Sequence, residues 1–186
     1  MTLKTRATLS DLYREPGKAE LVNGEIVRMS PTGDWPNFTA MEIAVSLRAY
    51  VKKTKIGRAV SDNAAFRVRL PNRESFSPDA AYYIGPRGKM KFFEGAPRFA
   101  AEVRSEGDYG PAAERAMAEK RADYFAAGTL VVWDVDLLGE DVVRVYRASA
   151  PRTAKVYRRG EIAEAEPAVP GWTMPVDDLF EDEDGI

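Results

Sequence analysis

Short runs of β-prone residues, several alternating between apolar and polar positions, predict the strands of this chain. "AELVNGEIVRM" places two such runs around Asn23-Gly24, a pair that suits the two-residue type I′ turn of a β-hairpin. "AAFRVRL" alternates like a half-buried strand, whereas "TLVVWDVD" is a continuous apolar run typical of a strand buried on both faces. Further strands are predicted in "AAYYI", in "RFAAEVR", and in "DVVRVYRA" and "TAKVYRR", the last two as later antiparallel strands.

Two longer segments carry apolar residues at helical spacing. The first is Phe38–Lys53, and the second is Pro111–Ala126, with Gly128 where a helix terminator is expected. Thr8 predicts the cap of a short helix near the N-terminus, with Asp11 three residues further on. The Gly- and Pro-containing segments between these elements are predicted to be loops: "SPTGDWPN", "PNRESFSPD" and "GPRGKMKFFEGAP".

The order of these elements predicts an α/β (α+β) fold with a mixed central sheet flanked by helices and an N-terminal β-hairpin. A length of 186 residues with 45% hydrophobic residues suits a single domain over residues 1–186, with C-terminal strands and an acidic tail in 148–186. The start lacks the apolar run of a signal peptide, and no window approaches a membrane-spanning helix. We therefore expect a cytoplasmic protein without a membrane partner.

The absence of histidine and cysteine narrows the possible chemistry. Structural zinc sites, disulfides and nucleophile systems that depend on histidine or cysteine are ruled out. Catalysis must rest on the remaining polar side chains, and a bound metal must accept oxygen ligands, which favours Mg²⁺ or Mn²⁺. The formal net charge of −2 argues against a protein that is basic over its whole surface, but not against a local basic cleft.

The stretch "RFAAEVRSEGDYG" carries the first candidate chemistry. Glu102 and Arg104 lie two residues apart, so they share one face of a mostly apolar strand. Asp79 follows a proline at the start of the preceding strand, and if the two strands are neighbours, both carboxylates can reach one point. Two convergent carboxylates repel each other unless a cation offsets the charge, which is how a Mg²⁺ site for phosphodiester hydrolysis is built. The alternative is a permanent ion pair between Glu102 and Arg104.

The basic residues that could lie near these carboxylates can each be interpreted in two ways, as part of a functional site or as ordinary structural residues. Lys120 falls on the apolar stripe of the second helix, where a lysine either extends its amine to solvent or points at an anionic site. Arg104 can stabilise charge but cannot realistically give up a proton. Arg87, Lys89 and Lys91 in a Gly/Pro-rich loop are either phosphate contacts or an ordinary solvated loop.

Pro78-Asp79, Glu102-Val103 in a strand, and "KRADYFAAGTLVVWDVD" together resemble the Uma-two family of restriction endonucleases, within the PD-(D/E)xK nuclease superfamily. "AELVNGEIVRMSPTG" resembles the N-terminal hairpin of the family and the loop that follows it. The resemblance covers roughly residues 8–147, which we take as the core of the domain, and is weaker in the tail.

The resemblance implies a restriction-endonuclease-like fold and assigns roles to particular residues. It maps the metal-binding acids onto Asp79 and Glu102, the catalytic lysine onto Lys120, and a further acidic position onto Glu20. The chain departs from the family in two places: the loop "SPTGDWPNF" lacks a histidine that members often carry, and "RSEGD" follows Glu-Val in place of a Leu-Ser-Pro-Ser run. Because of the second departure, either Arg104 or Lys120 could fill the basic catalytic role.

The sequence thus predicts a metal-dependent endonuclease acting on DNA. Asp79, Glu102 and the Val103 carbonyl would hold Mg²⁺ (or Mn²⁺), and Glu20 would ligate or orient a metal-bound water. Lys120 would position the attacking water, and Arg104 would contact phosphate or substitute for the lysine. A homodimer would suit an enzyme that cuts both strands. The alternative is a nuclease-fold nucleic-acid-binding or regulatory protein without turnover, which the missing histidine and Arg104 motivate.

Overall fold

The computed structural model describes residues 6–181, so most of the predicted acidic tail, at 182–186, lies outside the described residues. The helical segments are α1 (Leu9–Leu12), α2 (Asp34–Thr54), α3 (Pro111–Ala126) and the 3₁₀ helix η1 (Val176–Leu179). The strands are β1 (Ala19–Val22), β2 (Glu25–Arg28), β3 (Arg58–Val60), β4 (Phe66–Arg67), β5 (Ser75–Phe76), β6 (Ala80–Tyr83), β7 (Phe93–Glu94), β8 (Phe99–Val103), β9 (Val131–Val135), β10 (Val143–Arg147), β11 (Ala150–Tyr157), β12 (Ile162–Glu164) and β13 (Thr173–Pro175).

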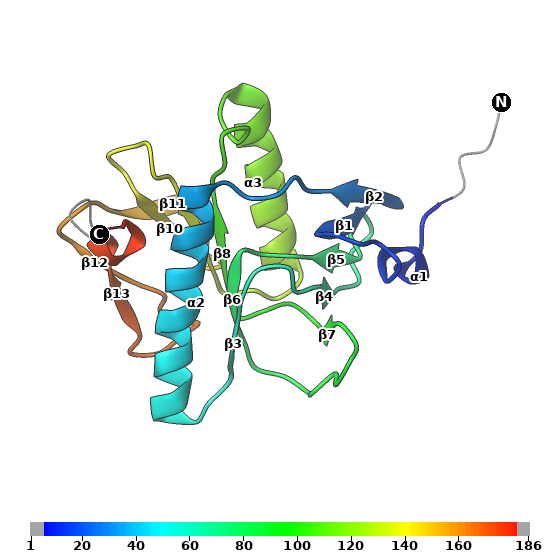
Figure 1. Ribbon diagram of the computed structural model, residues 1–186, viewed down its shortest axis with the longest axis horizontal. Helices are drawn as coiled ribbons and strands as arrows, with labels where there is room; N and C mark the ends of the chain where they lie inside the picture. The colour runs from blue at the N-terminus through cyan, green and yellow to red at the C-terminus, as the bar shows by residue number, and fades with distance from the viewer. Residues whose placement is uncertain (1–5, 182–186) are drawn as a thin grey trace.

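A mixed sheet forms the centre of the molecule, with the strand order β11-β10-β9-β8-β6-β3 (Figure 1). Strands β8 and β9 are parallel, and the other pairs in this sheet are antiparallel. The α3 helix joins β8 to β9, as a parallel pair requires a crossover connection. The predicted mixed central sheet flanked by helices is therefore confirmed.

The two long helices cover opposite faces of this sheet. On β8 and β9, Phe99 and Trp133 point into a core shared with Ile43 and Leu47 of α2. Their neighbours Ala100 and Val132 point the other way, into a core shared with Tyr124 of α3. This alternation follows from the period of two in a strand, and it places Glu102, which is also an even-numbered position of β8, on the face that α3 covers.

The predicted hairpin is confirmed and packs beside a smaller sheet. Strands β1 and β2 pair around Asn23 and Gly24, whose φ angles of 52° and 74° are the positive values of a type I′ turn. The smaller sheet has the order β5-β4-β7, and Leu21 of β1 donates its N–H to the Ser75 hydroxyl of β5, at 2.8 Å. This contact holds the hairpin against the segment that leads into β6.

Some predicted boundaries were wrong. Helix α2 begins at Asp34 rather than Phe38, because Pro36 lies in its first turn, where the missing N–H has no helical partner to lose. The loops predicted around residues 71–79 and 85–97 contain the two-residue strands β5 and β7. In "AAFRVRL" only Phe66–Arg67 forms a strand. These strands are too short for alternation to reveal them.

The chain after residue 147 continues the same structure. Strand β11 pairs with β10 in the central sheet. Trp172 contacts Phe99 and Trp133, with ring centroids 5.5 and 5.1 Å apart, in the core beneath α2. The single domain over 1–186, with its core at 8–147, stays a prediction. Among residues 6–181, no helix combines the length and the apolar character needed to cross a membrane.

Candidate active site

The two predicted metal-binding acids lie on neighbouring strands. Strand β6 pairs with β8, with Ala80 opposite Ala101, so Asp79 and Glu102 flank this register. The Asp79 N–H donates to the Ala101 carbonyl at 3.1 Å, and the Asp79 carboxylate accepts the N–H of Val103 at 2.7 Å. Asp79 is therefore fixed to the strand that carries Glu102, as the sequence argument required.

Glu102 lies under α3 and is held by two side chains of that helix. Lys120 Nζ donates to Glu102 Oε2 at 2.8 Å, and the Tyr124 hydroxyl donates to Oε1 at 2.6 Å. Residues i and i+4 share a helix face, so one side of α3 presents both donors. The Glu102 side chain keeps 24% of its surface exposed, which leaves part of the carboxylate open to solvent.

Glu20 enters the site from the hairpin and is almost completely buried. Its Oε1 accepts the Ser77 N–H at 2.8 Å and lies 3.0 Å from Lys120 Nζ. Its Oε2 accepts a hydrogen bond from Arg73, which also contacts Asp123 of α3 at 2.8 Å. Lys120 thus lies between the carboxylates of Glu20 and Glu102, at the junction of the hairpin, β8 and α3.

Lys18 completes the arrangement just before β1. Its ammonium contacts Asp79 and, at 2.6 Å, Asp62. The ion pairs of this site link five carboxylates with three cations: Glu20, Asp62, Asp79, Glu102 and Asp123 with Lys18, Arg73 and Lys120. We call these eight residues the acidic site. Five carboxylates and three cations give it a formal charge of −2.

The pKa values in the acidic site reflect burial and this crowding of charge. Burial raises the pKa of Glu102, and the neighbouring carboxylates Asp79 and Glu20 raise it further against the opposing effect of Lys120. Burial alone would raise the pKa of Glu20, but Lys120 and Arg73 outweigh it and the pKa falls below its usual value. Burial would lower the pKa of Lys120, but Glu102 and Glu20 raise it well above the usual range.

Asp79 and Glu102 offer carboxylate oxygens, the type of donor that magnesium prefers. Among residues 6–181, no three acidic side chains lie close enough to form a complete metal site. Mg²⁺ does not need one, because it keeps several waters and is commonly held by one or two carboxylates plus phosphate oxygens of a substrate. The two carboxylates come from neighbouring strands, and the charge of Asp79 is one of the causes that raise the pKa of Glu102.

Arg104 does not take the position that the sequence predicted for it. Its guanidinium binds both oxygens of Asp134, at 2.7 and 2.8 Å, and also pairs with Glu114. The side chain is only 4% exposed, so its donors face inward rather than toward a phosphate. The predicted phosphate contact is corrected to an internal ion pair, and the alternative pairing with Glu102 is also not formed, since Glu102 pairs with Lys120. Lys120, not Arg104, is the basic residue beside the acids.

The basic loop between β6 and β7 is exposed, as expected both for a phosphate-binding loop and for an ordinary solvated loop. Arg87, Lys89 and Lys91 are all exposed, and the Lys91 ammonium lies 5.3 Å from the centre of the Tyr13 ring. Their contact with phosphate stays a prediction.

Sequence reasoning missed several residues of the site. Lys18 and Arg73 lie in short loops without a pattern, and only the fold brings them to Asp79 and Glu20. Tyr124 packs in the core, where its ring stacks on Phe76 with ring centroids 4.0 Å apart. Its hydroxyl contact with Glu102 was signalled only by the Lys-x₃-Tyr spacing on α3.

Comparison with known proteins gives a consistent picture. Residues 7–177 match the Uma2 family model, described as "Putative restriction endonuclease". The chain is also similar to a crystal structure of a putative nuclease belonging to DUF820 from Anabaena variabilis ATCC 29413. That similarity has a TM-score of 0.72 at 20% sequence identity, over 93% of this chain and 97% of the other. No curated protein matches. The restriction-endonuclease-like fold is thereby confirmed.

Proposed function

Because the chain belongs to the Uma2 family, whose description is "Putative restriction endonuclease", we propose that it hydrolyses phosphodiester bonds of DNA with the help of Mg²⁺ or Mn²⁺. Family membership supports the general class, a nuclease. The observation that carries the specific proposal is the position of Lys120, whose ammonium lies 2.8 Å from Glu102 and 3.0 Å from Glu20 beside the Asp79 carboxylate.

Asp79, Glu102 and the Val103 carbonyl are the proposed ligands of the ion. When bound, Mg²⁺ supplies a Lewis acid that polarises the phosphate and lowers the pKa of a water molecule. Asp79 is oriented by the N–H of Val103, and Glu102 by the Tyr124 hydroxyl. Lys18 contacts Asp79 in this structure, so its ammonium must give way for Asp79 to bind an ion.

Lys120 acts through its charge rather than as a base. Burial opposes its protonation, but Glu102 and Glu20 raise the pKa enough to keep the ammonium protonated at neutral pH. The ammonium therefore orients the attacking water and stabilises the negative charge that develops on the phosphate. Glu20 is a positioning residue in this scheme, because its two oxygens are occupied by Ser77, Arg73 and Lys120.

The proposal that the substrate is DNA rests on the positive charge near the acidic site. The loop between β6 and β7 carries the exposed residues Arg87, Lys89 and Lys91, which would contact phosphates on either side of the reacting bond. A homodimer would bring two acidic sites to the two strands of a duplex.

The test is a cleavage assay with plasmid, linear duplex and single-stranded DNA in Mg²⁺, Mn²⁺ or EDTA. We expect cleavage in the divalent metals alone and a loss of about a hundredfold or more in Glu102→Gln, because a metal ligand contributes several kcal/mol to the transition state. Isothermal titration should show weaker Mg²⁺ binding by the same variant. Tight Mg²⁺ binding without cleavage of any substrate would instead support the alternative, a nuclease-fold binding or regulatory protein.

A further inference from the structure

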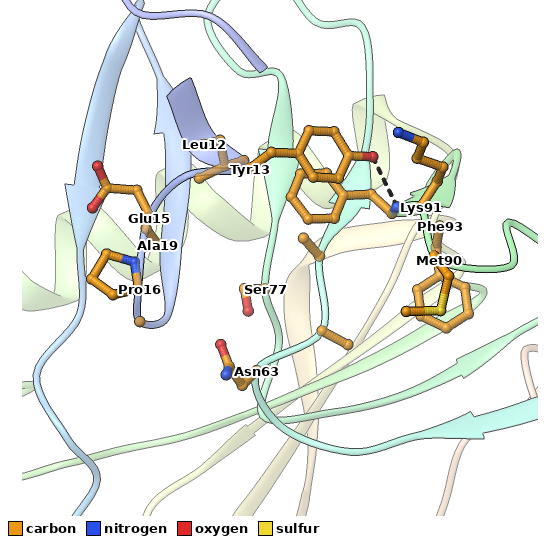
Figure 2. A pocket seen from close by; sticks show the side chains of 14 residues that line it. Leu12, Tyr13, Glu15, Pro16, Ala19, Asn63, Ser77, Met90, Lys91 and Phe93 are labelled. Atoms are coloured by element: carbon orange, nitrogen blue, oxygen red, sulfur yellow. Dashed lines mark hydrogen bonds between the residues drawn. The ribbon is translucent and has the colours of Figure 1, made fainter. Parts of the chain in front are cut away.

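A pocket lies beside the acidic site. It has a volume of about 330 Å³ and opens between α1, the start of β1 and the loops around Asn63 and Lys91 (Figure 2). This volume is at the lower end of the range of about 300–1,000 Å³ for ligand pockets, so the pocket suits one small group rather than a duplex. We call it the side pocket.

One wall of the side pocket is aromatic. Tyr13 and Phe92 stack on each other, with ring centroids 3.8 Å apart and planes within 7°, and the Tyr13 hydroxyl accepts the Phe92 N–H at 3.0 Å. Met90 on the same side is 95% exposed. Flat, apolar and partly exposed walls of this kind are the surfaces on which nucleic-acid bases stack.

The floor of the side pocket carries polar groups without protein partners. Ser77 is only 2% exposed, and its hydroxyl makes no hydrogen bond to any residue between 6 and 181. The side-chain amide of Asn63 likewise has no partner within that range, and it lies near Ser77 in Figure 2. Both groups are free to hydrogen-bond a ligand with polar edges, and ligand pockets commonly carry a few such polar groups in an otherwise apolar lining.

The same two residues connect the side pocket to the acidic site. The Ser77 N–H donates to Glu20 at 2.8 Å, and Ser77 precedes Asp79 by two residues. Asn63 follows Asp62, which pairs with Lys18. A ligand on the pocket floor would thus lie beside residues that are joined directly, or through a chain neighbour, to Glu20 and Lys18 of the acidic site.

We propose that the side pocket binds the base of an unpaired nucleotide next to the phosphate that is cleaved. The inference rests on the proposed function and narrows its substrate to single-stranded or locally unpaired DNA. A base inside a duplex is stacked and paired on its edges, so it could reach Asn63 and Ser77 only after being extruded. An unpaired base is free to stack on the aromatic wall and to use the hydroxyl and amide as hydrogen-bonding partners.

The test compares binding of a fluorescein-labelled single strand and of the same strand in a blunt duplex, by anisotropy in Ca²⁺ without Mg²⁺. Gly17→Phe fills the side pocket: Gly17 lines it, a Cβ there meets no atom within 4 Å, and its φ is not positive. Gly107→Phe is the matched control, because Gly107 has the same properties but lies outside the pocket. Ser77→Ala and Asn63→Gly remove the two polar groups, and glycine suits the φ of 60° at Asn63.

We expect the wild type and Gly107→Phe to bind the single strand about tenfold more tightly than the duplex. Gly17→Phe should lose this preference, and Ser77→Ala and Asn63→Gly should each reduce it. Equal binding of the two forms by the wild type, or an unchanged preference in Ser77→Ala and Asn63→Gly together, would overturn the pocket assignment even if Mg²⁺-dependent cleavage is observed. A preference that depends on the pocket supports the assignment even in a protein that cleaves nothing, in which case only the nuclease proposal fails.

Discussion

Glu102 and Arg104 stand two residues apart at the end of β8, yet they belong to two different charge clusters. Glu102 is part of the acidic site, with five carboxylates linked to three cations. Arg104 lies between Asp134 and Glu114, with a two-point contact to Asp134, a set that we call the Arg104 network. One cluster has five carboxylates and three cations beside a pocket, while in the other Asp134 and Glu114 face Arg104 and, 4.0 Å from Asp134, Arg121.

This difference distinguishes charged residues that serve a functional site from charged residues that stabilise the fold. In the Arg104 network, the hydrogen bonds that the guanidinium donates to Asp134 are the main cause that raises the pKa of Arg104. In the acidic site, Glu102 has a raised pKa because burial and nearby carboxylates disfavour its charge. Perturbed pKa values of this kind are common at functional sites, which favours the acidic site over the Arg104 network as the site of chemistry.

The largest predicted effect is a loss of folding stability when Arg104 is replaced, and it tests the comparison of the two clusters. Arg104→Leu leaves Asp134 buried with Arg121, 4.0 Å away, as its nearest cation. We expect the free energy of unfolding to fall by about 3–5 kcal/mol, as for other broken buried ion pairs. Urea denaturation measures it, with Arg158→Leu, in an exposed pair with Asp141, as a control that should change little. Glu102→Gln should leave metal-free stability nearly unchanged. Similar losses in Arg104→Leu and Glu102→Gln would remove the distinction between the clusters.

Local signals in the sequence accounted for much of the fold. Asn23-Gly24 requires positive φ angles that few other residue pairs adopt easily, so it identified the hairpin and its register. Thr8 and Asp11 form the predicted capping box, and Gly128, at a φ of 106°, follows α3 as predicted. Each of these features depends on neighbours within a few residues, which a single sequence displays directly.

Long-range partners could not be predicted in the same way. The spacing of Glu102 and Arg104 gave their common strand face, but not that parallel pairing places Asp134 directly opposite Glu102 and within reach of Arg104. Asp134 belongs to the apolar run "TLVVWDVD", where nothing local indicates its partner. Lys18 is likewise 61 residues from Asp79. Residues that meet only after folding leave no local pattern, so the balance of charge at each cluster had to come from the structure.

A smaller effect concerns the competition for Asp79. The Lys18 ammonium contacts Asp79 where a metal ion would bind, and its side chain is only 13% exposed. In Lys18→Met the carboxylate is no longer paired with this cation, so we expect Mg²⁺ affinity without DNA to rise on the order of fivefold, equivalent to about 1 kcal/mol. Isothermal titration with the wild type as reference measures the change. Weaker Mg²⁺ binding in the variant would mean that Lys18 orients Asp79 for the ion rather than competing with it.

The smallest effect lies at the rim of the Arg104 network. Glu114 contacts the same guanidinium as Asp134, but its side chain is 55% exposed, compared with 7% for Asp134. Solvent screens an exposed partner, so Glu114→Gln should lower the free energy of unfolding by less than about 1 kcal/mol, while Asp134 still binds Arg104 at two points. Urea denaturation beside Arg104→Leu gives the ratio of the two effects. A loss as large as that of Arg104→Leu would show that Arg104 depends on both acids equally, and that the network extends to the protein surface.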